Sequence, residues 1–375
     1  MSENQIINKD DKVLENDDVL DPKMINDDNI YPMNNIKVEK GFFTVFELKR
    51  KYDMAEKRII LDSDFQRDDV WNKSQKAELI ESVLMGLPLP IFYFNQDKQG
   101  RLIVVDGRQR LTALFDFMSN KWPLRNLNVL SNLNKKYFRD LTPLEQSQLE
   151  DYQIQAHVIK PPTPDRIKFD IFDRVNRAGT QLNKQEIRNA LYQGKATSLL
   201  KKLTEREEFI KATGNAFDKR SRMKDRYIIL RYIAFEFLIN GDLLNYEYKN
   251  DIDDLLGKTM EYMNSMSDKE IKRISDDIIH TLMKVNMVFT ENAFKLYNVN
   301  GKYGPINMNV FETLMYFMRR VDIKNNEQII KIEELVNKMK NNYKFRNAIG
   351  NHRDNINKIK LRFNIMNKML EELND

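Results

Sequence analysis

Cysteine is absent from the 375 residues, and glycine and proline are scarce, with 12 and 10 copies. A chain without cysteine has no disulfides, no thiolate zinc ligands and no thiol nucleophile. The first residues contain no apolar signal-peptide core, and the longest apolar run, residues 227–239, is interrupted by Arg231 and Glu236. We therefore expect neither a secreted nor a membrane protein, but one located in the cytoplasm.

Charge is distributed unevenly along the chain. Residues 1–40 hold 10 acidic and 5 basic residues, which leaves 46 acidic and 56 basic residues in the remainder. The acidic, asparagine-rich start lacks hydrophobic periodicity, so we expect residues 1–40 to be a disordered leader. The basic body is compatible with a nucleic-acid partner such as DNA but does not require one.

Short apolar stretches alternate with helical patterns between residues 41 and 162. The predicted strands are residues 91–94, 102–105 and 154–158, and the expected N-cap of a helix before them is Asn72 or Ser74. This alternation predicts a small α+β domain over residues 41–162.

Apolar residues recur with a helical spacing from residue 163 to the end of the chain. Asn183 and Glu186 have the spacing of a capping box for a helix that runs to Gly194, and Ser267 and Glu270 repeat it. We predict a mainly α-helical domain over residues 163–375, so that the whole chain has the α+β class.

The stretch Val104–Leu111 joins a predicted strand to a predicted helix through Asp106 and Gly107. A helix N-terminus carries the positive end of the helix dipole, and a glycine there allows an anion to approach the backbone closely. Arg108 and Arg110 add two guanidinium groups that suit bidentate phosphate contact. The simpler interpretation is a strand-to-helix turn with surface arginines, in which Asp106 only caps the helix.

Four separated segments carry a family resemblance. They are Asp64–Arg67 with Val70–Trp71, Leu79–Pro90, Asp106–Thr112, and Ile171–Leu182 with Glu186–Ala190. In this order they resemble the DGQQR-motif domain, the N-terminal or specificity part of GmrSD-type modification-dependent restriction systems, over about residues 42–195. Arg108 stands where the family motif has its first Gln.

The resemblance implies a ParB/sulfiredoxin-like fold for residues 41–162 and nucleoside triphosphate hydrolysis coupled to defence against foreign DNA. Sulfiredoxin chemistry itself is excluded because it needs a cysteine. Mg²⁺ is the expected cofactor, with Asp106 as its candidate ligand. The expected catalytic residues are Asp106, Gln109 and Arg110, and the expected nucleotide contacts are Gln66, Arg67, Gly107, Arg108, Arg110, Asn176 and Arg188.

The nuclease of such restriction systems is of the HNH type, which needs a histidine base and further metal ligands. His157, His280 and His352 are the three histidines of this chain, and they are widely separated. The sequence thus resembles a sensor or regulatory subunit that works with a separately encoded HNH-type nuclease. The alternatives are a non-hydrolysing, nucleotide-switched DNA-binding module and, with less support, a nuclease.

Residues 331–368 combine ten Lys and Arg with three Asp and Glu, and Tyr343, Phe345 and Phe363 lie among them. Mixed cationic and aromatic residues are typical of surfaces that follow a nucleic-acid backbone. We favour the alternative, a pair of amphipathic helices with core aromatics and solvated lysines.

Overall fold

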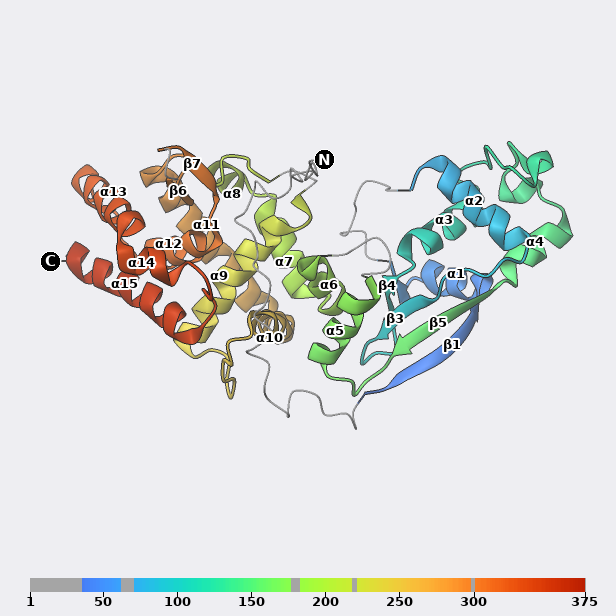
Figure 1. The fold of residues 1–375 in the computed structure, drawn as a ribbon, viewed down its shortest axis with the longest axis horizontal. Coiled ribbons are helices and arrows are strands. Elements are labelled where there is room, and N and C mark those ends of the chain that lie inside the picture. The colour runs from blue at the N-terminus through green and yellow to red at the C-terminus, as the bar shows by residue number, and fades with distance from the viewer. Residues whose placement is uncertain (1–35, 62–70, 177–182, 218–220, 298–300, 375) are drawn as a thin grey trace, which may run out of the picture. The chain divides into compact units, whose positions relative to one another are not determined.

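The computed structural model describes residues 36–374 except for 62–70, 177–182, 218–220 and 298–300. The described chain forms two compact units, the first ending at Leu191 and the second beginning at Tyr192 (Figure 1). The first unit contains a five-stranded mixed sheet with helices, and the second is largely helical. The predicted α+β class is therefore confirmed.

The sheet of the first unit has the strand order β1-β5-β3-β4-β2. Strands β1 and β5 are antiparallel, as are β3 and β4, whereas β3 pairs with β5 and β2 with β4 in parallel. The strands are β1 (Val38–Thr44), β2 (Ile59–Ile60), β3 (Phe92–Gln96), β4 (Leu102–Asp106) and β5 (Gln153–Ile159). The predicted strands correspond to β3, β4 and β5. Strand β1 begins at Val38 and therefore includes residues 38–40, which were expected to belong to the disordered leader.

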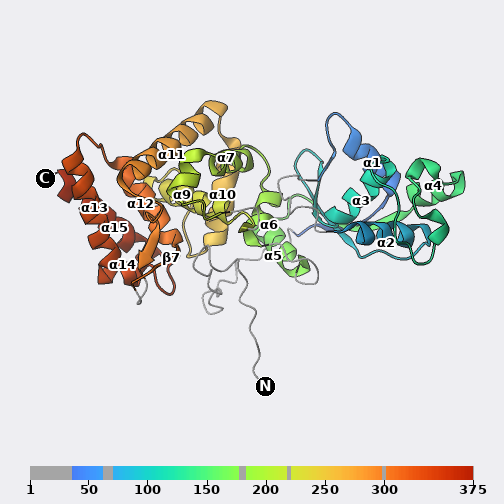
Figure 2. The same ribbon diagram turned by 90° about the horizontal axis from the view of Figure 1, so that it is seen from above.

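Helices cover both faces of this sheet (Figure 2). One face packs on α1 (Val45–Asp53), α2 (Lys73–Leu84), α3 (Arg108–Met118) and α4 (Pro143–Glu150), and the other on α5 (Asp165–Asn176) and α6 (Lys184–Leu191). Two 3-10 turns, η5 (Ser131–Leu133) and η6 (Phe138–Asp140), lie between α3 and α4. Val104 packs into the apolar core on the side of α1–α4, and Val105 packs into the core on the side of α5 and α6. Because β4 is buried on both faces, its sequence is a continuous apolar run.

The boundary between the units follows α6 rather than the start of the helical region. Helices α5 and α6 lie within the span 163–375, yet both pack on β4 of the sheet. Ile187 of α6 contributes to the same core cluster as Val105 of β4. The sheet therefore needs these two helices to bury its second face.

The capping signals in the sequence correspond to observed helix starts. Asn72, rather than Ser74, caps α2, and its side chain forms a capping box with Gln75. The Asn183 and Glu186 side chains each accept the other's backbone N–H, at 2.8 and 2.7 Å. The expected end of this helix at Gly194 was wrong, because α6 stops at Leu191 and Gly194 is the N-cap of the next helix.

The second unit encloses one large apolar core. It contains α7 (Lys195–Thr204), α8 (Glu207–Ala212), α9 (Lys224–Asn240), α10 (Ile252–Ser265), α11 (Asp268–Val288), α12 (Met308–Arg320), α13 (Asn326–Asn341), α14 (Tyr343–Ala348) and α15 (Ile356–Asn374). Ser267 and Glu270 form the predicted capping box at the start of α11. A small hairpin of β6 (Lys295–Tyr297) and β7 (Tyr303–Ile306), which the sequence analysis did not predict, lies between α11 and α12.

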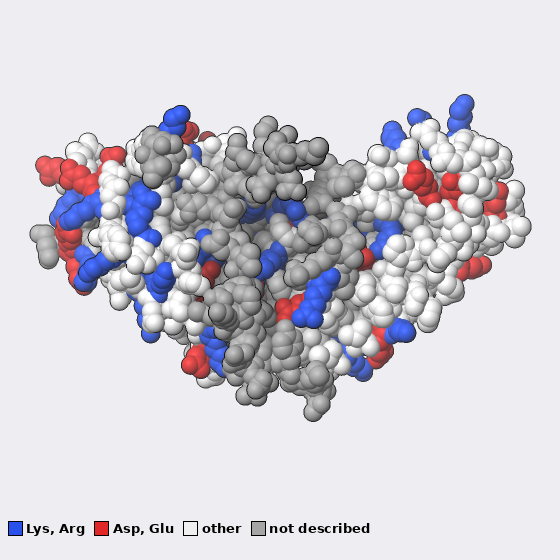
Figure 3. Space-filling view, viewed as in Figure 1, with Lys and Arg blue, Asp and Glu red and all other residues white. Residues whose placement is uncertain are grey.

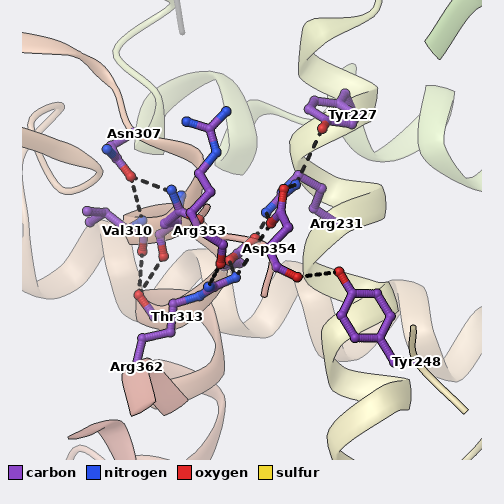
Figure 4. A network of polar contacts seen from close by, with 11 residues as sticks. Tyr227, Arg231, Tyr248, Asn307, Val310, Thr313, Arg353, Asp354 and Arg362 are labelled. Carbon is purple, nitrogen blue, oxygen red and sulfur yellow. Dashed lines mark hydrogen bonds and ion pairs between the residues drawn. The ribbon is translucent and has the colours of Figure 1, made fainter. Parts of the chain in front are cut away.

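A buried ionic cluster joins three helices of this core (Figure 4). Arg231 on α9 donates to Glu312 on α12 at 3.0 Å and to Asp354 at 2.7 Å, and Arg362 on α15 donates to Glu312 at 2.5 Å. Burial opposes the charge of Arg231, but Asp354 and Glu312 outweigh burial and raise its pKa well above the ordinary value. Two cations and two carboxylates thus balance one another inside the protein.

None of the helices in the described part of the chain has the length and apolar content that crossing a lipid bilayer requires.

Candidate functional site

The candidate site begins at Gly107, the single residue between β4 and α3. Its φ of +95° lies in the left-handed region, where residues with a Cβ are strained. A Cβ built on Gly107 would lie 2.1 Å from the Cδ1 atom of Phe92 on the neighbouring strand β3. Backbone conformation and packing against Phe92 therefore both require glycine at this position.

The N-terminus of α3 has the features of an anion-binding helix end. Gly107 is its N-cap and offers no side-chain hydrogen bond to the first turn. The N–H of Leu111 donates to the Gly107 carbonyl at 2.9 Å, so the amides of residues 108–110 precede the regular helical bonding. These amides and the helix dipole favour negative charge beyond the end of β4.

Asp106 and Arg110 flank this helix end as an ion pair. Arg110 Nη2 donates to Asp106 Oδ2 at 2.7 Å, and the guanidinium also donates to the carbonyls of Pro90 and Ile91. It lies 4.1 Å from the centroid of the Phe92 ring. The Arg110 side chain is 10% exposed, whereas that of Asp106 is 40% exposed. Arg110 is thus held inside while the carboxylate reaches the surface.

Burial and the ion pair shift the pKa of Arg110 in opposite directions. Burial lowers the pKa of Arg110, and the Asp106 carboxylate opposes that shift. The arginine remains protonated, since its ordinary pKa lies far above neutral. Its positive charge, fixed by three acceptors, orients the Asp106 carboxylate next to the N-terminus of α3.

Arg108 and Gln109 are both partly exposed in the first turn of α3. The Gln109 Oε1 atom is buried and has no hydrogen-bond partner among the described residues. A buried amide oxygen without a partner loses a hydrogen bond that water would provide, so it needs an explanation. A ligand donor at the helix end is one such explanation.

The other expected site residues fall into two groups. Gln66 and Arg67 lie outside the described residues, as does the side chain of Asn176, the last residue of α5. Arg188 is buried on α6, where it donates to Gln185 Oε1 at 3.1 Å and lies 5.5 Å from the Phe169 ring centroid. It therefore belongs to a helix that packs on β4, the strand ending at Asp106.

Three buried polar residues near these elements were missed by the sequence analysis. Asn95 on β3 is 3% exposed, and its Oδ1 has no described partner. Gln185 on α6 is 4% exposed, and its Nε2 has none either. Glu81 on α2 has a structural role, since it accepts the N–H groups of Val129 and Leu130. The sequence signal that could have indicated Asn95 is its position directly after the aromatic run 92–94.

The carboxylates of the described residues limit how a metal ion could be held. No group of three or more His, Asp or Glu side chains with suitable spacing occurs in this part of the chain. Asp106 supplies one partly exposed carboxylate next to the N-terminus of α3. This donor set fits Mg²⁺, which commonly uses one or two carboxylates together with substrate phosphates and water.

The first unit is thus an α+β domain that presents a glycine-led helix end, an acidic group and arginines at the end of one strand. Residues 48–193 match the family model of the GmrSD restriction endonuclease, N-terminal domain. The chain carries a domain of this family, as the sequence motifs indicated, and is a component related to GmrSD restriction systems. Comparison with curated proteins and with solved structures gave no match. The ParB/sulfiredoxin-like likeness therefore stays a prediction.

Proposed function

We propose that the first unit binds and hydrolyses a nucleoside triphosphate, and that the protein acts as a sensor or regulatory subunit of a DNA restriction or phage-defence system. The observation that carries this proposal is the N-terminus of α3, which has no side-chain cap and lies between the Asp106 carboxylate and Arg108. The family of residues 48–193 supports the restriction context.

The phosphates would bind at the start of α3. Backbone N–H groups of the first helical turn donate to phosphate oxygens, and the helix dipole stabilises their charge. Arg108, partly exposed in this turn, adds a guanidinium that suits bidentate phosphate contact. Gln109 would contribute its buried amide, and Arg188 on α6 would add a second cation from the other side of β4.

Asp106 would act at the reacting phosphate, either as a ligand of Mg²⁺ or by orienting the attacking water. When bound, Mg²⁺ neutralises phosphate charge. Arg110 is a positioning residue in this scheme, because its guanidinium is occupied by Asp106 and by two backbone carbonyls. It keeps the carboxylate in one orientation, which is the protein's main contribution to phosphoryl transfer.

Nucleotide occupancy would report to a partner that cuts DNA. A separately encoded HNH-type nuclease is the partner that the family context suggests. In this scheme the partner cleaves the DNA. The described residues contain no cluster of three metal ligands. Co-purification from the native host followed by mass spectrometry tests the partner, and recovery without any nuclease argues against it.

The test of the site compares nucleotide binding and phosphate release for ATP, GTP, CTP and UTP with Mg²⁺. Arg108→Ala should weaken nucleotide binding about tenfold, because it removes charge-assisted hydrogen bonds. Asp106→Asn should retain binding and lose hydrolysis at least a hundredfold, roughly the scale of removing one electrostatic catalytic group.

A matched control is available in the same unit. Arg101 pairs with Asp97 four residues away in the turn between β3 and β4, at 2.6 Å. Arg101→Ala removes the same charge as Arg108→Ala at a distance from α3 and should leave nucleotide binding unchanged. Equal losses in both variants, or no nucleotide binding by the natural protein, would remove the proposed site.

A further inference from the structure

The second unit carries a cationic surface around the short helix α14. It is formed by Tyr343, Lys344 and Arg346 on α14 and by the Tyr297–Tyr303 pair of the β6–β7 hairpin, and the buried Lys340 at the end of α13 lies next to Arg346. We call this set the α14 surface. Figure 3 shows Lys and Arg side chains over α13, α14 and the hairpin, with acidic side chains at the outer border of the same region.

Hydrogen bonds hold these groups together. Arg346 Nε donates to the Lys340 carbonyl at 2.6 Å, and its Nη2 donates to the Tyr297 carbonyl at 3.4 Å. Lys340 Nζ donates to the Asn292 carbonyl at 3.3 Å, just before β6. The hairpin and α14 are thereby joined, so cations and aromatic rings occupy one continuous patch.

The positive charge of this patch has no counterion among the described residues. Among the described residues, no carboxylate pairs with Lys340, Lys344 or Arg346, and the acceptors of Lys340 and Arg346 are neutral carbonyls. Burial and the nearby Arg346 lower the pKa of Lys340 to about 8. Two cations that repel each other, one of them buried, would be stabilised by an anion bound at the partly exposed Arg346.

Aromatic rings next to the cations are exposed. Tyr343 is 80% exposed, and Tyr297 and Tyr303 are 45% and 43% exposed. The Tyr297 and Tyr303 rings stack with centroids 4.2 Å apart, and their hydroxyl groups hydrogen-bond at 2.7 Å. That bond raises the pKa of Tyr303 to about 12, so the Tyr303 hydroxyl stays neutral near neutral pH. Flat neutral rings beside fixed cations suit bases joined by phosphates.

Helical position separates these residues from the core. Phe345, two residues after Tyr343, is fully buried, and Phe363 on α15 is 4% exposed. The amphipathic interpretation of residues 331–368 therefore holds for these two phenylalanines. It is wrong for Tyr343, which is 80% exposed and lies outside the apolar core, whereas the exposed Lys344 fits its solvated lysines.

We propose that the α14 surface binds single-stranded nucleic acid, with phosphates on Lys344 and Arg346, the charge of the buried Lys340 next to them, and an unpaired base stacked on Tyr343. Duplex DNA is a less suitable ligand, because its bases are already stacked on one another and a tyrosine ring cannot reach their faces. The site lies in the second unit and is independent of nucleotide hydrolysis in the first.

The experiment measures fluorescence anisotropy of a labelled mixed-sequence single-stranded DNA with the full chain over a range of salt concentrations. Tyr343→Ala should weaken binding about tenfold or more, the scale of losing one base–aromatic stack. Lys344→Ala should reduce the slope of log K against log salt by about 0.7, the value for one phosphate contact on a single strand. Neither residue has a partner in the described fold, so both variants should remain folded.

Controls separate this surface from general charge effects. Lys272→Ala removes an exposed lysine of α11 that pairs with Asp276, and it should leave the salt slope unchanged. Tyr343→Phe keeps the ring and should bind like the natural protein. Glu333 lies close enough to Tyr303 to influence its pKa, and Glu333→Gln should strengthen binding slightly by removing a negative charge.

Three results would overturn the proposal. One is the absence of salt-dependent binding by the natural protein. Another is equal loss in Lys272→Ala and Lys344→Ala. The third is duplex DNA or labelled polyglutamate binding as tightly as the single strand with no effect of Tyr343→Ala, since that pattern belongs to a general anion surface.

Discussion

The two units both bury arginine, but they compensate its charge in different ways. In the second unit Arg231 and Arg362 are fully buried and share Glu312 and Asp354, so that charges balance within the core. In the first unit Arg110 faces one carboxylate, Asp106, whose side chain is 40% exposed. A closed cluster supports the fold, whereas an open pair leaves a carboxylate available for chemistry.

The largest expected effect breaks the closed cluster. Glu312→Gln removes the carboxylate that two buried arginines share, and it should destabilise the second unit by about 3–5 kcal/mol, the usual loss when a buried ion pair is broken on one side. Urea unfolding followed by circular dichroism measures this change. Asp276→Asn, at the exposed pair with Lys272, is the matched control and should stay within about 0.5 kcal/mol of the natural protein.

The next largest effect concerns Gly107, which lies beside the Asp106–Arg110 pair. Gly107→Ala and Gly100→Ala both place a Cβ at positive φ, +95° and +78°, but only at Gly107 does the new atom meet Phe92. Gly100→Ala should destabilise by about 1–2 kcal/mol. Gly107→Ala should lose about 1–3 kcal/mol more through overpacking. Phe92→Leu combined with Gly107→Ala should recover part of that excess, and equal losses in the two single variants would contradict the packing argument.

Local patterns in the sequence predicted much of the first unit. The runs 91–94 and 102–105 became β3 and β4, and Asn72, Asn183 and Ser267 became caps, because a strand or a capping box is encoded within a few residues. The junction at Gly107 was predicted for the same reason.

Contacts between distant segments could not be predicted in this way. Phe92 meets Gly107 only because β3 pairs with β4 in one register, and Glu312 meets Arg231 across 81 positions of sequence. The β6–β7 hairpin was missed because β6 has only three residues and β7 four. Arg110 illustrates the consequence for the site, since the sequence motif predicted a phosphate ligand but could not show that its guanidinium donates to Asp106 and to the Pro90 and Ile91 carbonyls.

Asp106→Asn sharpens the comparison directly, because it removes one carboxylate from an arginine, as Glu312→Gln does. Here the loss of stability should be about 1 kcal/mol or less, since Asp106 is partly solvated and the Pro90 and Ile91 carbonyls still hold Arg110. Urea unfolding of the two variants side by side provides the measurement. A loss for Asp106→Asn as large as that for Glu312→Gln would show that the pair is structural.

Lys340 extends the comparison to a buried cation that has no carboxylate partner among the described residues, and its effect on stability should depend on pH. Its pKa in the folded protein is about 8, below the ordinary 10.5, so the unfolded chain binds more protons between these values and stability should rise with pH across that range. Relative to the natural protein, Lys340→Met should be about 3 kcal/mol more favourable below pH 8 than near pH 10.5, because the difference of about 2.5 between the two pKa values corresponds to about 1.4 kcal/mol per unit.

Unfolding free energies of the two proteins across this pH range test the prediction, because every other titrating group is common to both. A gain that does not change with pH would mean that packing of the methionine, rather than removal of the charge, is responsible. Saturating single-stranded DNA gives a second comparison. If phosphates bind next to the buried Lys340, the oligonucleotide should stabilise the natural protein more than Lys340→Met, and the difference between the two proteins should shrink.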